Sequence, residues 1–559
     1  MTDAIDSILA IDHGSVSTKV ALLDLVEGRY RFVTQVEALT QADDPRTSLL
    51  AAVEATQRKA GRRLLENDRL LTPECTNGSG VDAVVVTTSA GSPLRVLLAG
   101  IVPEASNAAI HRVVARVPAQ VAGTLGIDDL RRHGGLKGAS EFLNQLPIDV
   151  ILFAGGSDGT SADSLVQVAR AIAAVKTDGE EPALVYAGNK DALPDIADIL
   201  SSRVTMHTVP NIEPGRGRYN LQPACEELYQ AYIQRDGALG AVCRSMMPLE
   251  RTTLLAEAKG TGISTRFIAL WSQVDTLVAD VGSHTSSVFS VISGEYSATV
   301  KPGIGIGVGA HAALQSIGIA KVLSWLSPAV SEDLVLDLVM NKSLRPNTVP
   351  STADDVLIEM ALTREILAMI SPPARTFGMI VISGGVAARL QNQGLVALAV
   401  LDALQPRAPV RLAIDDLSLL GRLGALATIH PEAAGQVLVE DALCPLGTAI
   451  SVAGRAKEGE VAVIAKVQYA SGGHIEVHVP FGGIEVVPLA RAGNARLVLQ
   501  PARTLQIGNA PPGKSQTMEV TGGSVGVIID ARGRPLELPL SPDKRGEKLE
   551  EWLRALSPV

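Results

Sequence analysis

Two short stretches of the chain carry residue types that bind phosphate. Residues 12–19 read DHGSVSTK and residues 280–287 read DVGSHTSS. Each begins with an aspartate at the end of an apolar strand, continues through glycine and serine, and leads into a second apolar strand. The glycine allows a tight turn and a close approach to phosphate, and the amides and hydroxyls that follow can donate to phosphate oxygens. The sequence therefore contains a repeated strand–turn–strand unit.

The repeat predicts a site for a polyphosphate and a metal ion. Asp12 and Asp280 can hold Mg²⁺ and orient its waters, because this ion prefers oxygen ligands and keeps several waters. A lysine, present only in the first copy, can add positive charge near the β- and γ-phosphates. The candidate phosphate-binding residues of the two turns are Gly14, Ser15, Ser17, Thr18 and Lys19, and Gly282, Ser283, His284 and Thr285.

A third glycine motif completes the candidate site. Residues 381–388, VISGGVAA, are predicted to form a strand, a Gly-Gly turn and the start of a helix. A turn made by Gly384 and Gly385 would let the backbone approach a flat adenine or its ribose closely. We therefore expect ATP to lie between the two hairpins, with its adenosine near this turn.

A different phosphate-loop pattern near the C-terminal end is rejected. Residues 508–515, GNAPPGKS, match G-x-x-x-x-G-K-[ST]. That motif needs a helix beginning at its Lys-Ser pair, but QTMEVTGG follows, which offers no helical face. Pro511 and Pro512 also remove two amide donors. We predict a turn between β-strands here.

Several other polar residues have two possible roles. Asp158, in GGSDGT, either activates the attacking water or caps a helix that begins near residue 161, where Ser161 competes for the cap. His13 and His284 either donate to phosphate, or tolerate unusual backbone angles in the turns or face solvent. The segment KPGIGIGVGAH at 301–311 lacks the spacing of a dinucleotide-binding loop and is predicted to be a flexible rim of the second lobe.

Composition restricts the class of protein. The 559 residues exceed one ordinary core, and 46% of them are hydrophobic, which is enough to build several cores. A formal net charge of −10 and only 3% aromatic residues argue against nucleic-acid binding. The four cysteines form no C-x-x-C pair, so no zinc or cluster site is expected. The N-terminus lacks a signal-peptide pattern and no apolar stretch is long enough to span a membrane, which predicts a cytoplasmic protein.

The order of the expected elements divides the chain into four parts. Residues 1–110 hold the first hairpin, and residues 111–235 alternate strands, glycine-rich loops and helices, as in a parallel sheet. Residues 236–445 hold the second hairpin and the Gly-Gly motif. Residues 446–559 contain short strands, such as IEVHV with its half-exposed alternation, and end in an amphipathic helix.

The order of these motifs resembles the actin, sugar-kinase and Hsp70 superfamily over roughly the first 430 residues. Within it, the chain is similar to the MutL/GlmL family, the glutamate mutase L proteins associated with adenosylcobalamin-dependent mutases. Besides the two hairpins and VISGGVAA, the similar stretches are TTSAGSPLRVLLAGIVPE, DVILFAGGSDGT, LVYAGNK and ARGRPLELP. The pair AGGSDGT and YAGNK is the most specific, because simple sugar kinases and actins lack it.

The resemblance implies an α/β fold class: a two-lobed actin-like (ribonuclease-H-like) ATPase fold with an inserted parallel α/β segment and a C-terminal β-rich domain. It implies ATP and Mg²⁺ as cofactors, and a role as chaperone or reactivation factor for an adenosylcobalamin-dependent mutase. It is compatible with a homo-oligomer. Two other classes stay open, a small-molecule kinase of the same superfamily and a non-catalytic actin-like scaffold or filament protein.

Overall fold

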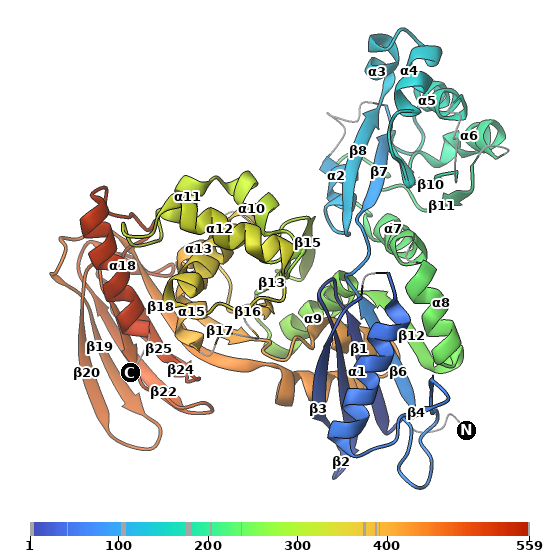
Figure 1. Ribbon diagram of the computed structural model, residues 1–559. Helices are drawn as coiled ribbons and strands as arrows, with labels where there is room; N and C mark the ends of the chain where they lie inside the picture. Colours follow the sequence, from blue (N-terminus) through green and yellow to red (C-terminus); the bar gives the residue numbers. More distant parts are fainter. Residues whose placement is uncertain are drawn as a thin grey trace.

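The computed structural model describes residues 5–41, 43–101, 108–174, 181–201, 204–235, 237–372, 376–385, 388, 390 and 392–556. Two mixed sheets of the same topology form two lobes, and a segment inserted into the first lobe builds a third, parallel sheet (Figure 1). This arrangement confirms the fold class expected from the sequence.

The first lobe is a five-stranded sheet with the order β12-β6-β1-β2-β3. The central strand β1 pairs antiparallel with β2 and parallel with β6. Helix α1 ends at residue 60, because Gly61 takes a left-handed conformation and terminates it. The elements are β1 (Ser7–His13), β2 (Ser17–Val26), β3 (Arg29–Leu39), α1 (Pro45–Ala60), the short pair β4 (Leu65–Glu66) and β5 (Arg69–Leu70), β6 (Ala83–Thr88), α8 (Gly237–Met246) and β12 (Thr252–Ala256).

The second lobe repeats this arrangement. Its sheet begins β15-β14-β13-β16-β17, and the central β13 again pairs antiparallel with the hairpin strand β14 and parallel with β16. The repeat seen in the sequence is therefore a repeat of the fold. The elements are β13 (Thr276–Val281), β14 (Thr285–Ile292), β15 (Glu295–Pro302), α10 (Ala310–Ile317), α11 (Ile319–Leu323), α12 (Glu332–Leu344), α13 (Ala353–Ile370), β16 (Met379–Gly384), α15 (Gln393–Leu404) and β17 (Val410–Ile414).

Two helices cross between the lobes. Helix α9 (Glu257–Ser272) follows the last parallel strand of the first lobe, and α16 (Leu420–Ala427) follows that of the second (Figure 1). They touch through their backbones: a Cβ on Gly260 would lie 2.1 Å from the carbonyl oxygen of Gly421, and a Cβ on Gly424 would lie 1.8 Å from that of Gly260. Since real Cβ contacts are never this short, only glycine permits the crossing. Helix α17 (Pro431–Val437) and the π-turn at Leu438–Ala442 then pack with α16 against the first lobe.

The chain between β6 and β12 forms a sheet in which every pair is parallel, in the order β11-β10-β9-β7-β8. Alternation of strands and helices predicted this parallel sheet. The elements are β7 (Leu94–Ala99), α2 (Ala108–Val114), β8 (Ala119–Leu125), α3 (Ile127–Arg132), α4 (Leu136–Leu143), β9 (Val150–Phe153), α5 (Asp163–Ala173), β10 (Ala183–Tyr186), α6 (Leu193–Leu200), β11 (Met206–Thr208) and α7 (Gln222–Arg235).

The C-terminal region is not a detached module. Its strands β18, β25 and β21 continue the sheet of the second lobe, and a separate antiparallel sheet has the order β20-β19-β22-β24. Residues 508–515 lie in the connection between β23 and β24, which confirms the turn predicted there. The elements are β18 (Cys444–Gly454), β19 (Val461–Tyr469), β20 (His474–Pro480), β21 (Ile484–Val487), β22 (Asn494–Pro501), β23 (Leu505–Ile507), β24 (Gln516–Thr521), β25 (Gly526–Asp530) and α18 (Pro542–Leu556).

Among the helices of the described residues, none combines the length and the apolar character needed to cross a membrane.

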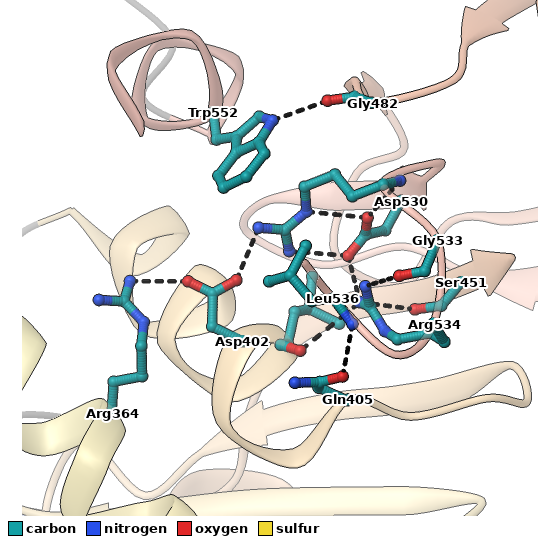
Figure 2. Close-up of polar contacts among 12 residues, drawn as sticks. Arg364, Asp402, Gln405, Ser451, Gly482, Asp530, Gly533, Arg534, Leu536 and Trp552 are labelled. Carbon is teal, nitrogen blue, oxygen red and sulfur yellow. Dashed lines mark hydrogen bonds and ion pairs between the residues drawn. The ribbon is translucent and has the colours of Figure 1, made fainter. Parts of the chain in front are cut away.

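A buried ionic network fixes this C-terminal region to the second lobe (Figure 2). Arg532 donates to both carboxylate oxygens of Asp530, at 2.9 and 2.8 Å, and to Asp402 of α15 at 2.6 Å. Asp402 also forms an ion pair with Arg364 of α13 at 2.7 Å. Burial alone would raise the pKa of Asp530, but the charges of Arg532 and Arg534 outweigh burial and hold it well below its usual range. The negative charge of Asp530 is therefore stable in this buried place only because the two arginines lie beside it.

The final helix is held by the same network. The guanidinium of Arg532 lies 4.7 Å from the ring centroid of Trp552, and the indole nitrogen of Trp552 donates to the carbonyl of Gly482 at 2.8 Å (Figure 2). The same network of ion pairs therefore joins three segments that are distant in sequence: α13, α15 and the stretch from β25 to α18.

Removing one charge from this network is expected to destabilise the protein strongly. Asp530→Asn leaves Arg532 and Arg534 buried without a full counter-charge, and breaking a buried pair in this way costs about 3–5 kcal/mol. Thermal unfolding should show a clear fall in Tm. The control is Glu537→Gln, which removes a carboxylate from an exposed pair with Arg455 and should leave Tm unchanged. Equal Tm values for the two variants would contradict a structural role for the network.

Candidate functional site

The two hairpins open onto a single cavity between the lobes. Its volume is about 480 Å³, and both Asp12 and Asp280 line it. The predicted residues that the structure brings together here are Asp12, Gly14, Ser15, Ser17, Lys19, Asp280, Gly282, Ser283, His284, Thr285, Gly384 and Gly385. Sequence positions about 270 residues apart therefore meet in one place.

The first hairpin holds its aspartate by strand pairing. In the register of the sheet, Asp12 on β1 faces Lys19 on β2 and Thr87 on β6. The hydroxyl of Thr87 donates to Asp12 Oδ1 at 2.9 Å, which fixes the orientation of the carboxylate. The amide of Gly14 donates to the carbonyl of Ser17 at 3.1 Å and closes the turn.

The second hairpin has the same construction. Asp280 on β13 faces Ser287 on β14 and Ser383 on β16. The amide of Gly282 donates to the carbonyl of Thr285 at 3.0 Å, as Gly14 does to Ser17 in the first copy. Serine replaces lysine opposite the aspartate, so of the two hairpins only the first carries a lysine at this position.

The glycine-rich segment after β15 forms a wall of this cavity. Four hydrogen bonds tie it to the second hairpin: the amides of Ile306, Gly307 and Gly309 donate to the carbonyls of Gly282 and Ser283, and that of Val308 donates to Ser283 Oγ. A Cβ at Gly305 would lie 2.4 Å from the Ser283 carbonyl oxygen. The prediction of a flexible rim at residues 301–311 is therefore wrong, because Gly305, Gly307 and Gly309 have no side chain and let the backbone of this segment bond directly to the turn.

Acidic groups gather at the floor of the cavity. Burial raises the pKa of Asp280 to about 6, and the charges of Asp415 and Asp12 add to that rise. Ser383 and Lys19 oppose it.

Burial also raises the pKa of Glu257 well above its ordinary value, and the charge of Asp280 contributes. Several buried carboxyl groups therefore share this floor, and a bound cation would stabilise their charged forms.

Glu257 is a site residue that the sequence analysis missed. It is the first residue of α9, directly after β12, and its hydroxyl partner is Thr261 one turn later. Polar residues at the carboxyl end of a parallel strand often belong to sites, so the position after the strand TTLLA carried a usable signal. The ion pair between Lys342 and Glu359, on α12 and α13, also lines the cavity. Nothing local in the sequence marks that pair.

Arg422 is the other missed residue. It belongs to α16, lines the cavity and is almost fully buried. Its guanidinium donates to Gln35 Oε1 at 2.7 Å and to the carbonyl of Ala10 at 3.3 Å, both in the first lobe. A side chain of the second lobe's helix thus binds the first lobe beneath the cavity.

Two predicted residues lie elsewhere. Thr18 is fully buried, and its hydroxyl bonds to Nδ1 of His13 at 3.0 Å and to Thr40 Oγ1 at 2.9 Å, so it does not line the cavity. His13 is buried with it. His284 does line the cavity; burial lowers its pKa, and its Nδ1 has no hydrogen-bond partner among the described residues.

Asp158 is not part of this cavity. Its carboxylate accepts from Lys190 N at 3.2 Å and from Asn211 Nδ2 at 2.9 Å within the inserted sheet. Asp158 does not cap α5, which begins at Asp163: the side chain that accepts from the amide of Asp163, at 3.3 Å, is Ser161. The place of Asp158 outside the cavity also separates it from the two hairpins. The second half of the Gly-Gly motif, residues 386 and 387, lies outside the described residues.

The residues present fit a magnesium ion bound together with phosphate. Within the described ranges no group of three or more His, Cys, Asp or Glu side chains converges to hold a metal alone. Mg²⁺ is typically held by one or two carboxylates, with phosphate oxygens and waters completing its shell. Asp12 and Asp280 supply two carboxylates, and burial raises the pKa of Asp280 although Lys19 opposes the rise.

The duplicated lobes, the crossing helices and the cavity between them define a two-lobed actin-like protein. The model of the MutL protein family matches residues 8–371, and the chain belongs to this family. A protein named MutL from Clostridium tetanomorphum is 25% identical over 316 residues. That match covers 54% of this chain and 60% of the relative, so it spans less than two thirds of the relative's length.

Solved structures show a weaker likeness. A nucleotide-free acetone carboxylase is 12% identical with a TM-score of 0.35, covering 86% of this chain and 82% of that one. Component A of the Acidaminococcus fermentans (R)-2-hydroxyglutaryl-CoA dehydratase is 10% identical with a TM-score of 0.29, covering 77% and 99%. Plasmodium falciparum glycerol kinase with ADP is 9% identical with a TM-score of 0.31, covering 78% and 94%. Such low scores do not bear on function.

The glycine wall can be tested by adding one methyl group. In Gly305→Ala the new Cβ would collide with the backbone of Gly282 and Ser283, which has no flexible end to move aside. We expect a loss of about 1–3 kcal/mol, as for other overpacked positions, seen as a lower urea midpoint. Gly240→Ala is the control, because its Cβ would meet only the end of Arg244 and alanine favours the helix. A midpoint for Gly305→Ala equal to that of the wild-type chain would show that the segment is loosely attached.

Proposed function

We propose that the chain binds ATP with Mg²⁺ in the cavity between its lobes and hydrolyses the nucleotide. The observation that carries this proposal is the duplicated Asp-x-Gly-Ser hairpin, with both copies lining one cavity. In each copy the turn amides and hydroxyls face a volume large enough for a small ligand. Backbone donors arranged in this way favour a polyphosphate over a neutral metabolite.

The shape of the cavity supports a nucleotide. Its hairpin end is polar and charged, whereas another part of the lining is apolar and lies beside the Gly-Gly turn. The apolar residues are Ile306, Pro346, Val349, Pro350, Val356, Leu390 and Leu395. A purine base prefers such surroundings, while its phosphates need the hairpins. We therefore assign the adenosine to the apolar part, near Gly384 and Gly385.

Chain residues can perform the phosphoryl transfer from this arrangement. A magnesium ion bound by Asp12 and Asp280 would neutralise charge on the phosphates. Lys19 reaches the same cavity and adds a positive charge opposite Asp12. Glu257 has the raised pKa of a group that can accept a proton from an attacking water. We assign the water-activating role to Glu257 in place of Asp158.

The identity of a partner protein is inferred from the family resemblance and not from the cavity. The MutL/GlmL resemblance implies an adenosylcobalamin-dependent mutase, and we propose that opening and closing of the lobes acts on such a protein as a chaperone or reactivation factor. The four-part division belongs to the same proposal, with the boundaries at 110 and 235 moved, because β7 already lies in the inserted sheet and β12 returns to the sheet of the first lobe. Affinity capture from native lysate, with and without ATP, tests it. Nucleotide-dependent retention of a mutase subunit supports the role, whereas retention only of further copies of this chain favours a filament or scaffold.

The catalytic assignment predicts a separation of binding from turnover. Glu257→Gln keeps the size of the side chain but removes its ability to accept a proton, so release of inorganic phosphate should fall by about 10²–10⁴-fold. Nucleotide affinity, measured by calorimetry, should stay within a few-fold of wild type. Glu332→Gln is the matched control, since Glu332 also begins a helix but is exposed. Undiminished phosphate release from Glu257→Gln would remove the assignment.

The raised pKa of Asp280 predicts that nucleotide binding depends on pH. Below about pH 6 this carboxyl is protonated, and a proton there competes with the metal. The Kd for a non-hydrolysable ATP analogue with Mg²⁺ should therefore rise roughly tenfold between pH 7 and pH 5. Asp280→Asn removes the titrating group, so only the analogue's own titration should remain. The same pH profile in wild type and Asp280→Asn would place the metal elsewhere.

A further inference from the structure

The inserted domain has the topology of a ligand-binding sheet of its own. In chain order its five parallel strands are arranged 2-1-3-4-5, from β8 through β7, β9 and β10 to β11. The helix after β7 packs on one face, in the cluster with Ile110, and the helix after β9 packs on the other, in the cluster with Leu165. The connections therefore leave in opposite directions at the carboxyl ends of β7 and β9. In open parallel sheets, ligands bind at this reversal point.

A cavity lies at that point. It has a volume of about 260 Å³ and is separate from the cavity between the lobes. Gly100 lines it after β7, the segment from Ala154 to Ser157 lines it after β9, and Asn211 and Arg216 line it after β11. All of these residues follow the carboxyl ends of strands, as the topology requires.

The floor of this cavity is bare backbone. A Cβ on Gly100 would lie 2.4 Å from the carbonyl oxygen of Ala154, so no larger residue fits there. Gly156 has φ +69°, a conformation that L-residues rarely adopt. Within the described part of the chain, the amides of Gly155, Gly156 and Ser157 donate to no protein acceptor. Three adjacent backbone donors are thus available to a ligand.

Buried side chains hold this loop in place from behind. Asn211 Nδ2 donates to the carbonyl of Gly156 and to Asp158, both at 2.9 Å. Asn189 is fully buried and donates to the carbonyl of Thr160 at 2.9 Å. The stretches AGGSDGT and YAGNK, which have no part in the cavity between the lobes, therefore meet here. Their polar residues are used to shape a loop whose own amides stay unpaired.

One cationic side chain, Arg216, lies at the rim of this cavity and can bind an anion. Arg216 is exposed at the cavity mouth, and its guanidinium forms no hydrogen bond or ion pair with the described residues. The acidic neighbour, Glu213, accepts a hydrogen bond from the amide of Gly217 at 3.0 Å. Adjacent amides together with a guanidinium form a typical phosphate-binding set.

We propose that the inserted domain carries a second binding site, for a phosphate-bearing small molecule, at the carboxyl ends of β7 and β9. The phosphate is bound by the amides of residues 155–157 and by Arg216, and the remainder of the molecule extends along the cavity beside Gly100. This site does not depend on the ATP site proposed above, because the two cavities share no residue.

Hydrogen exchange with rapid labelling tests this in the full-length chain, since it reports on each site separately. Inorganic pyrophosphate is the first probe and AMP the second. Each should slow exchange in peptides covering residues 153–160 in a saturable manner. Stronger protection by AMP would show that a nucleoside is recognised, and equal protection would show that phosphate alone is. A failure of the ATP site would appear instead in peptides covering residues 10–20 and 280–288.

Arg216→Ala should raise the pyrophosphate concentration for half-maximal protection of residues 153–160 by at least about tenfold, the usual value of a charge-assisted hydrogen bond. Arg218→Ala, an exposed neighbour outside the cavity lining, is the control and should leave that concentration unchanged. No protection of residues 153–160 by either probe, or equal shifts in both variants, would overturn the proposal.

Discussion

The contact on which the structure depends is the crossing of α9 and α16. Gly260 meets Gly421 and Gly424 backbone to backbone, and Ser264 Oγ donates to the carbonyl of Leu420 at 2.7 Å. Each helix leaves the last parallel strand of one lobe and packs against the other lobe. Because both helices begin beneath the cavity, their first residues, Glu257 and the segment around Gly421, form its floor. The spacing of the lobes and the position of the acidic groups are therefore fixed together.

The sequence was informative wherever a local pattern recurs. The two Asp-x-Gly-Ser turns predicted a duplicated hairpin, and the pairing of Asp12 with Thr87 and of Asp280 with Ser383 follows from placing each aspartate at the end of a central strand. Alternating strands and helices likewise predicted the parallel inserted sheet. These features depend on a few neighbouring residues, so their physical cause can be read locally.

Features that depend on long-range pairing were not predictable in the same way. The strand TTLLA returns to the first sheet after more than a hundred intervening residues, which brings Glu257 to the cavity. Arg422 reaches the first lobe only because glycine lets α9 and α16 approach so closely. Asp158 was misplaced because GGSDGT carries the residue types of a catalytic loop, whereas its location is set by a different sheet. The residue types of the GGSDGT loop alone did not show which of the two cavities the loop lines.

The continuity of the second-lobe sheet into β18, β25 and β21 has a mechanical consequence. Arg364 and Asp402 connect this extension to α13 and α15, which also contribute Val356, Glu359 and Leu395 to the cavity wall. These ion pairs join the extension to the lobe on the side of the glycine crossing that carries the second hairpin. The sheet β20-β19-β22-β24 lies at the far end of this extension (Figure 1). If the lobes rotate about the glycine crossing, as the proposed function requires, this outer sheet moves through a longer arc than the cavity wall does.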